Sequence, residues 1–227
     1  MSRRSVSAHP QRAPVEFLES RIALSVALGM VPMGEQPQGP LSGRVVYTSA
    51  GHGWQWKDSL NRWATDRPNL LGMVEDFGNQ DQMTLYAEYL FQAGATVVPM
   101  RPIGRQLNEV VLDNDSPEVI WNGSWSINTA GPAWFDEDYG AVTDAVKYRF
   151  ATVNSARETA SAVYAPTIPE TGLYPVYVWA SASSNRTDQL YVINHTGGST
   201  EVRVDHRKVG NGWVWLGSYN FDAGRSP

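Results

Sequence analysis

Hydrophobic residues follow two different periods along this chain, and the change between them divides it into two parts. The first part contains a short apolar run without polar alternation, Val45–Tyr47, as expected for a strand covered on both faces. It also contains four apolar residues at i, i+4, i+7 and i+8, the spacing of one helical face. These residues are Met83, Ala87, Leu90 and Phe91. They predict a helix from about Glu75 to Gln92.

A second strand is predicted directly after that helix. Gly94 stands where the helix is expected to stop, and the strand follows from Ala95 to Met100. A crossover helix of this length suits a right-handed parallel βαβ unit, which we place at residues 44–108. Residues 54–72, which contain Trp, Pro and Gly, are expected to form a loop over the edge of this unit.

From about Val110 the pattern changes to short aromatic and β-branched runs separated by turn residues. Seven strands are expected there: Val119–Ile127, Ala145–Val153, Glu158–Tyr164, Gly172–Ala180, Gln189–Asn194, Glu201–Asp205 and Trp213–Phe221. Thr196–Ser199 and Gly210–Gly212 mark hairpin turns. Seven short strands with frequent turns predict a β-sandwich. The expected fold class is therefore an α/β βαβ unit followed by an all-β sandwich domain at residues 109–227.

Residues 1–43 follow neither pattern. Arg3, Arg4 and Arg12 precede a mainly apolar run from Ile22 to Met33. This run is too short to span a bilayer as a helix, but it suits the apolar region of a secretory signal. Leu18–Leu24 resembles the LEPR-x-LL tag at the front of some large bacterial surface proteins. We expect an export leader on a secreted or cell-surface bacterial protein, and a disordered tail is the alternative.

Composition narrows the chemistry that this chain can carry. The formal net charge of −5 gives no electrostatic support for nucleic-acid binding. The absence of cysteine excludes disulfides, thiolate zinc sites and cysteine nucleophiles. Any metal must therefore be bound by His, Asp or Glu. The histidines of the chain are His9, His52, His195 and His206.

Three motifs in the first part of the chain carry a family resemblance. They are Val45-Val46-Tyr47-Thr48-Ser49-Ala50-Gly51-His52-Gly53, Glu75-Asp76-Phe77-Gly78-Asn79 and Ala93-Gly94-Ala95-Thr96-Val97-Val98-Pro99-Met100-Arg101. They resemble the first strand and GHG turn, the E-x-x-x-N helix start and the A-G-x-x-V-x-x-x-R strand of zinc-dependent N-acetylmuramoyl-L-alanine amidases of the amidase-3 type. The likeness extends over residues 44–102.

The resemblance implies that His52 is the first zinc ligand, Glu75 the second, and Asn79 a residue that orients the Glu75 carboxylate. A zinc-bound water would then attack the amide between N-acetylmuramic acid and L-alanine. The family also needs a second histidine and a late catalytic glutamate, for which this chain offers no equivalent, so the catalytic residues stay unknown. A missing C-terminal half of the same protein is the expected partner. Without the resemblance, His52 is a loop residue and Glu75 an ordinary first-turn helix acid.

Four segments of the second part carry another resemblance: Tyr174–Trp179, Tyr191–Gly198, Val202–Asp205 and Gly212–Gly224. They resemble the golvesin/xanthan-lyase C-terminal-type domain. A further strand follows the last segment in that family, so the domain is expected to be truncated here. Domains of this type accompany secreted enzymes that act on glycans, which implies carbohydrate binding.

Sugar binding needs exposed aromatic faces for stacking, with polar side chains alongside for the sugar hydroxyls. The residues of these types are Trp121, Trp125, Trp134, Asn185, Arg186 and Asp188. The alternative is that the aromatic residues fill the core of the sandwich.

Together these features predict a secreted, cell-wall-related zinc amidase fragment with a glycan-binding β domain. Its expected partner is peptidoglycan or another extracellular glycan. The alternative is a non-catalytic extracellular carbohydrate-binding surface protein. A weaker alternative is a protein associated with a polysaccharide lyase, because the β domain resembles part of xanthan lyase.

Overall fold

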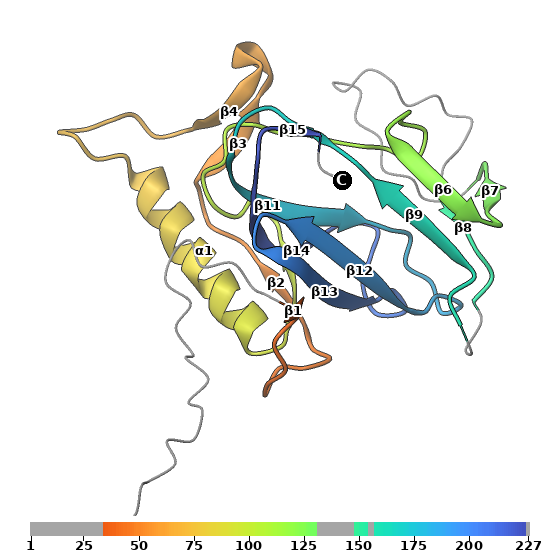
Figure 1. Cartoon of the computed structure of the whole chain (residues 1–227). Coiled ribbons are helices and arrows are strands. Elements are labelled where there is room, and N and C mark those ends of the chain that lie inside the picture. The colour runs from red at the N-terminus through yellow and green to blue at the C-terminus, as the bar shows by residue number, and fades with distance from the viewer. Residues whose placement is uncertain (1–33, 131–147, 154–156, 226–227) are drawn as a thin grey trace, which may run out of the picture.

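The computed structural model describes residues 34–130, 148–153 and 157–225, which form a mostly β structure with one α-helix (Figure 1). The helices are α1 (Glu75–Gln92) and the short 3-10 helix η1 (Asp58–Leu60). The strands before and beside α1 are β1 (Gly34–Glu35), β2 (Val45–Thr48), β3 (Trp54–Lys57), β4 (Arg62–Thr65) and β5 (Thr96–Pro99). The later strands are β6 (Val119–Gly123), β7 (Ser126–Asn128), β8 (Tyr148–Phe150), β9 (Ala160–Tyr164), β10 (Thr167–Ile168), β11 (Gly172–Trp179), β12 (Asp188–His195), β13 (Gly198–Asp205), β14 (Trp213–Phe221) and β15 (Gly224–Arg225).

The predicted βαβ unit is present. β2 and β5 pair in parallel, with Val46 opposite Val97, and α1 connects them. The helix spans the residues predicted for it, and its buried residues include Ala87, Leu90 and Phe91. Gly94 follows the helix with a positive φ of 90°, which glycine adopts without steric cost.

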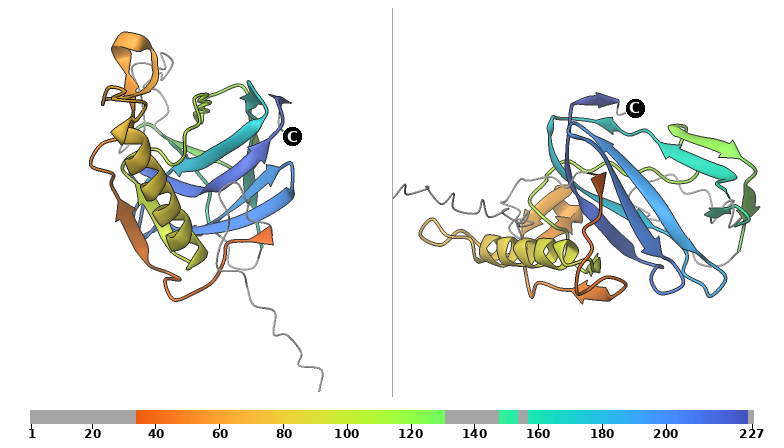
Figure 2. Two further views of the ribbon diagram at one scale, coloured as in Figure 1. Left: turned by 90° about the vertical axis from the view of Figure 1, so that its left-hand side faces the viewer. Right: turned by 60° about the horizontal axis from the view of Figure 1, so that its bottom comes forward.

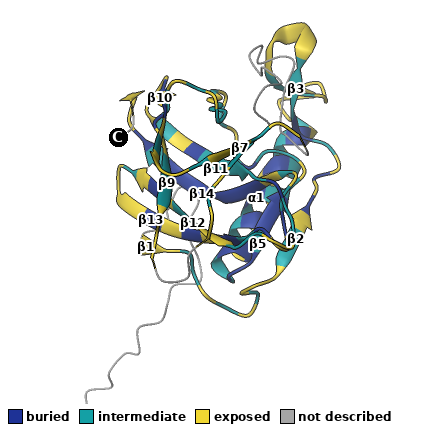
Figure 3. Cartoon of the chain, turned by 90° about the vertical axis from the view of Figure 1, so that its right-hand side faces the viewer, coloured by how far each residue is buried: buried dark blue, intermediate teal, exposed yellow. Residues whose placement is uncertain are grey.

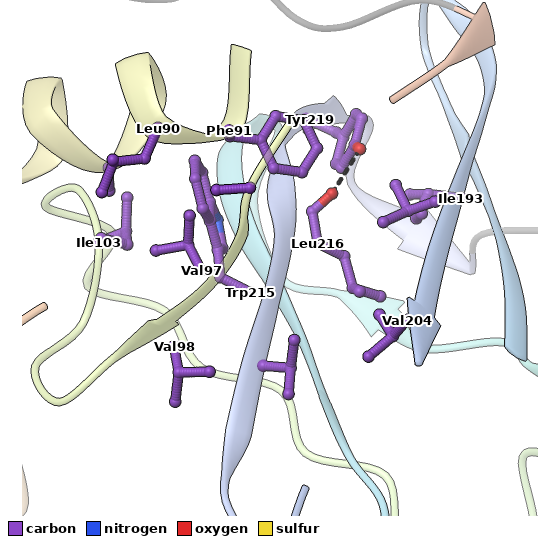
Figure 4. Packing of buried hydrophobic residues seen from close by; sticks show 14 of the residues in the cluster. Leu90, Phe91, Val97, Val98, Ile103, Ile193, Val204, Trp215, Leu216 and Tyr219 are labelled. Carbon is purple, nitrogen blue, oxygen red and sulfur yellow. Dashed lines mark hydrogen bonds between the residues drawn. The ribbon is translucent and has the colours of Figure 1, made fainter. Parts of the chain in front are cut away.

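The two parts of the chain that differ in pattern share one sheet. Its strand order is β11-β14-β5-β2, and β5 meets β14 antiparallel where Val97 lies opposite Trp215. A single hydrophobic cluster joins residues of α1, β5, β12, β13 and β14 (Figure 4). In this cluster the rings of Phe91 and Trp215 lie 5.2 Å apart between their centroids. The β-rich part therefore completes the sheet of the βαβ unit.

Residues 34–43, expected to belong to the leader, are part of the fold. β1 pairs in parallel with β13, whose other neighbour is β12. The Leu41 amide donates to the Ala93 carbonyl at the end of α1, and the Gln36 side chain donates to the Ala95 carbonyl. The leader prediction for residues 1–33 concerns residues outside the described ranges.

The remaining strands form two-stranded ribbons, which two views make visible beside the larger sheets (Figure 2). They pair as β3–β4, β6–β9, β7–β8 and β10–β15. The described strands thus make several mixed sheets and no closed barrel. The prediction of a β-sandwich is confirmed only as far as a mostly β structure. The strand expected over Val119–Ile127 is interrupted after Gly123, where the Trp125 indole donates to the Asn122 carbonyl. The loop predicted at residues 54–72 contains the β3–β4 hairpin.

β14 is the most continuously buried strand (Figure 3). Its register with β11 shifts between Val176 and Tyr177, which leaves Leu216 as an extra residue in a β-bulge. The buried Tyr219 hydroxyl donates to the Leu216 carbonyl at 2.7 Å and fixes the bulge. Among the described residues, no helix has both the length and the apolar character needed to cross a membrane.

Candidate functional site

Four side chains converge where β2 ends and α1 begins, and we call them the His52 cluster: His52, Glu75, Asp76 and Asn79. His52 Nδ1 lies 2.5 Å from Asp76 Oδ1. On the other side of the ring, His52 Nε2 lies 2.6 Å from Asn79 Nδ2 and 3.1 Å from Glu75 Oε1. The structure therefore brings together the three residues that the sequence singled out and adds a fourth, Asp76.

Asp76 is the buried member of this cluster. Its side chain is 0% exposed, and besides His52 it accepts hydrogen bonds from the backbone amides of Asp66 and Arg67. Burial by itself would raise the pKa of Asp76, but the hydrogen bonds from Arg67, His52 and Asp66 outweigh it and hold the pKa below its ordinary value. The carboxylate is thus kept ionised, and it ties the segment before α1 to the turn that carries His52.

The contacts of Asn79 differ from those expected. The sequence predicts that Asn79 orients Glu75, but the Asn79 amide donates to His52 Nε2. This arrangement suits the neutral tautomer of His52, in which Nδ1–H donates to Asp76 and Nε2 accepts. The physical reason is position on the helix: one turn separates Glu75 from Asn79, and both reach the same ring nitrogen.

Buried polar groups along the same face of α1 hold the neighbouring loops. Gln80 accepts from the Trp54 amide and donates to the Gly104 carbonyl, and Thr84 Oγ1 accepts from the Gly104 amide. From the end of β5, Arg101 Nε donates to the Ala50 carbonyl at 3.0 Å. His52 is therefore positioned by fixed backbone on both sides, which is typical of a preorganised site.

The residues of the His52 cluster fit part of a zinc site. Two ligands of a tetrahedral zinc ion lie roughly 3.4 Å apart given zinc–ligand distances near 2.1 Å, close to the 3.1 Å between His52 Nε2 and Glu75 Oε1. A carboxylate on the second ring nitrogen, as Asp76 provides, is a frequent support of metal-bound histidine. However, the described residues contain no group of three or more His, Cys, Asp or Glu able to hold a metal. A catalytic zinc site, which needs three protein ligands, is not completed by them.

A second group of side chains lies at the β6–β9 ribbon, and we call it the tryptophan cluster: Trp121 of β6, Tyr164 of β9, Trp125 of the turn after β6, and Arg149 of β8. Trp121 meets Trp125 edge to face at 4.7 Å and Tyr164 at 6.2 Å between ring centroids. The Arg149 guanidinium lies 5.0 Å from the centre of the Trp121 ring and is bound by Asp115 at 3.3 Å. Both indoles are half-buried and Tyr164 is 46% exposed, so the cluster reaches the surface.

The polar residues predicted to bind sugar form a separate group. Arg186 Nη1 donates to Asn185 Oδ1 at 2.7 Å, and Arg186 Nη2 donates to the Tyr148 hydroxyl at 3.3 Å. Asp188 lies at the start of β12 opposite Asp205. Tyr148 and Arg149 are neighbours on β8, so this strand contacts both groups. Trp134 lies outside the described residues.

The sequence pattern alone does not identify three of the residues at these sites. Asp76 was overlooked beside Glu75, although it lies on the helical stripe that continues through Gln80. Tyr148 and Arg149 were passed over as strand residues. Their signal was an arginine between two aromatic residues, Tyr148 and Phe150, on a strand near an expected tryptophan site.

The fold and these two surface groups define a β-rich structure that shares a sheet with one βαβ unit and carries aromatic and arginine side chains at its surface. Residues 110–227 match the Golvesin C-terminal domain family, and the chain belongs to that family.

A xanthan lyase of Bacillus sp. (strain GL1) is 31% identical to this chain over 137 residues, which are 59% of this chain and 14% of that protein. The solved structure of Paenibacillus xanthan lyase matches with a TM-score of 0.42 and 26% identity over 50% of this chain and 10% of that one. The chain therefore spans a small part of these relatives.

Proposed function

We propose that this chain is a non-catalytic extracellular carbohydrate-binding protein whose tryptophan cluster contacts a polysaccharide. The carrying observation is the edge-to-face packing of Trp121 and Trp125 at 4.7 Å beside the exposed Tyr164. Aromatic side chains offer a large apolar contact area, and the Trp N–H and Tyr O–H groups can hydrogen-bond to polar groups of a ligand. The relative named xanthan lyase supports a polysaccharide as the ligand, because this chain matches part of that protein.

Removing an indole from the tryptophan cluster should weaken polysaccharide binding. We expect Trp125→Ala and Trp121→Ala each to raise the dissociation constant about thirty-fold or more, since central aromatic anchors contribute about 2 kcal/mol or more to binding. Isothermal titration calorimetry against soluble xanthan and soluble peptidoglycan fragments measures this.

Tyr86→Ala is the matched control, because Tyr86 is 51% exposed on α1 and lies outside the tryptophan cluster. Thermal unfolding of each variant reports whether the fold is kept. Unchanged affinity in folded Trp121→Ala and Trp125→Ala variants contradicts the assignment of this surface.

A second candidate function, a zinc amidase fragment that acts on the N-acetylmuramoyl-L-alanine amide, is favoured by the 3.1 Å approach of His52 Nε2 to Glu75 Oε1 on a βαβ unit. Zinc would be held by these two residues, with Asp76 orienting the imidazole, and zinc supplies Lewis-acid activation of water when bound. The Asn79 amide donates to His52 Nε2, the ring nitrogen that zinc would need, so Asn79 would have to move away when zinc binds. Hydrolysis also needs a third ligand and a general base, which the described residues do not supply.

Zinc titration of the full chain tests this candidate. We expect binding in the parent, with His52→Ala and Glu75→Ala at least ten-fold weaker because each removes a ligand atom. Asp81→Ala serves as the control, since it removes an exposed acid from the same helix. If His52→Ala binds zinc as tightly as the parent, the ligand assignment is wrong.

A further inference from the structure

Two arginine–aromatic pairs each include a residue of β8, and the two arginines differ in whether an acidic side chain binds them. Arg149 lies over Trp121, and Asp115 binds its guanidinium. Arg186 lies with its Cζ 5.4 Å from the centre of the Tyr148 ring. Among the described residues no Asp or Glu lies within ion-pair distance of Arg186, although the chain carries a net charge of −5.

Among the described residues, the hydrogen-bond partners of Arg186 are all neutral oxygen atoms. Nε donates to the Ser181 carbonyl at 3.1 Å and Nη1 to Asn185 Oδ1 at 2.7 Å. Nη2 is shared between the hydroxyls of Tyr148 at 3.3 Å and Ser181 at 3.4 Å. Guanidinium has five N–H donors, and the described residues supply acceptors for four of them. The two long bonds to hydroxyls are readily exchanged for a charged acceptor.

The segment that carries Arg186 is held in place before any ligand binds. The Ser183 amide donates to the His206 carbonyl, and the Ala182 amide donates to Asn211 Oδ1 at 3.1 Å. His206 is buried beneath this segment, where Nδ1 contacts the Val209 carbonyl and Nε2 the Tyr191 hydroxyl. An arginine fixed in this way loses little conformational freedom on binding, which favours recognition.

We propose that Arg186 recognises a carboxylate on a sugar residue, so that the ligand of this chain is an acidic polysaccharide. This inference rests on the proposed carbohydrate binding and adds its charge class. A carboxylate would accept from the outer N–H groups of the guanidinium, which suit planar two-oxygen acceptors. The Asn185 amide and the Tyr148 hydroxyl would face the sugar hydroxyls around it.

The test compares polymers that differ in the carboxylate alone. Binding of the full chain is measured by calorimetry with xanthan and with polygalacturonate, each in native form and after chemical reduction of its carboxylates to alcohols. We expect at least ten-fold tighter binding to the native forms, and this preference should shrink as salt is added. Arg186→Gln should abolish the preference for the native forms.

Two further variants separate recognition from general charge. Arg203→Gln removes the same charge from an exposed position on β13 and should keep the preference. Arg186→Lys keeps the charge without the planar donor pair and should retain part of the preference. This variant also tests the proposal if Arg186→Gln does not fold.

Equal binding of native and reduced polymers by the parent overturns this inference and leaves the proposed carbohydrate binding intact. A full preference in folded Arg186→Gln also overturns it. Binding to none of the polymers overturns both proposals.

Discussion

Asp76→Asn is expected to lower the free energy of unfolding by about 3 kcal/mol at neutral pH, because a buried ionised acceptor is lost and a donor group is left without a partner. The substitution keeps the size of the side chain but exchanges one acceptor oxygen for an NH₂ group. That NH₂ group would face either the ring N–H of His52 or the backbone amides of Asp66 and Arg67, all of which are donors. Urea unfolding followed by tryptophan fluorescence measures the loss.

The effect depends on pH in a defined direction. The folded-state pKa of Asp76 lies below its ordinary value of 3.8, so the carboxylate contributes its stabilisation above that value. The contribution is lost as the pH falls through the folded-state pKa. The stability difference between parent and Asp76→Asn should therefore be constant near neutral pH and shrink below pH 3.8.

Asp81→Asn is the control for this experiment. Asp81 lies on the same helix, but its side chain is 51% exposed and pairs with Arg105 at the surface. Exposed ion pairs contribute about 0–1 kcal/mol, so this variant should remain close to the parent. Equal losses in the two variants would show that Asp76 does not hold the His52 turn.

Gly217→Ala is expected to destabilise the chain by about 3 kcal/mol, because backbone strain and overpacking act together. Gly217 has a φ of 116°, a conformation that residues with a Cβ rarely adopt. A Cβ there would lie 2.6 Å from the hydroxyl oxygen of Tyr219, which is fully buried. The bulge at Leu216 would have to open, and with it the packing of β14. Thermal unfolding and urea midpoints measure the change.

Gly212→Ala is the matched control on the turn before β14. A Cβ there meets no atom within 4 Å, and Gly212 has no positive φ. This variant should change stability by no more than about 0.5 kcal/mol. If both glycine variants unfold at the same urea concentration, the bulge does not need glycine.

The elements with strong local signals were predictable. The apolar spacing that ends at Phe91, followed by Gly94, places the end of α1 correctly, and the run Val45–Tyr47 becomes β2. These signals are local because helix periodicity and a glycine stop act within a few residues. The parallel pairing of β2 with β5 then follows from the length of the connecting helix.

The pairing of β5 with β14 was not predictable in this way. Both strands are apolar, and nothing near Val97 or Trp215 specifies the other as its neighbour. Such a contact is decided by tertiary packing, in which Trp215 covers Phe91 of α1. The sequence pattern therefore predicts a βαβ unit and a separate β domain.

The candidate sites were partly predictable. His52, Glu75 and Asn79 lie together as expected, because a helix brings residues four apart to one face. Asp76 was missed because a polar residue on a buried stripe resembles an exposed first-turn acid until its partners are known. On the β domain, the sequence identified Trp121 and Trp125 but not Arg149, whose position depends on the β7–β8 ribbon.

The central place of β14 in the sheet has a consequence for how the chain reaches its native state. β14 lies between β11 and β5, yet it is synthesised long after β5. During synthesis, β2, α1 and β5 have to wait with one edge unpaired and with Phe91 exposed until Trp215 has left the ribosome. Closing a loop of that length makes folding slow, and the unpaired edge is open to association with other chains in the meantime. The β11-β14-β5-β2 sheet is therefore assembled only after β14 has been made.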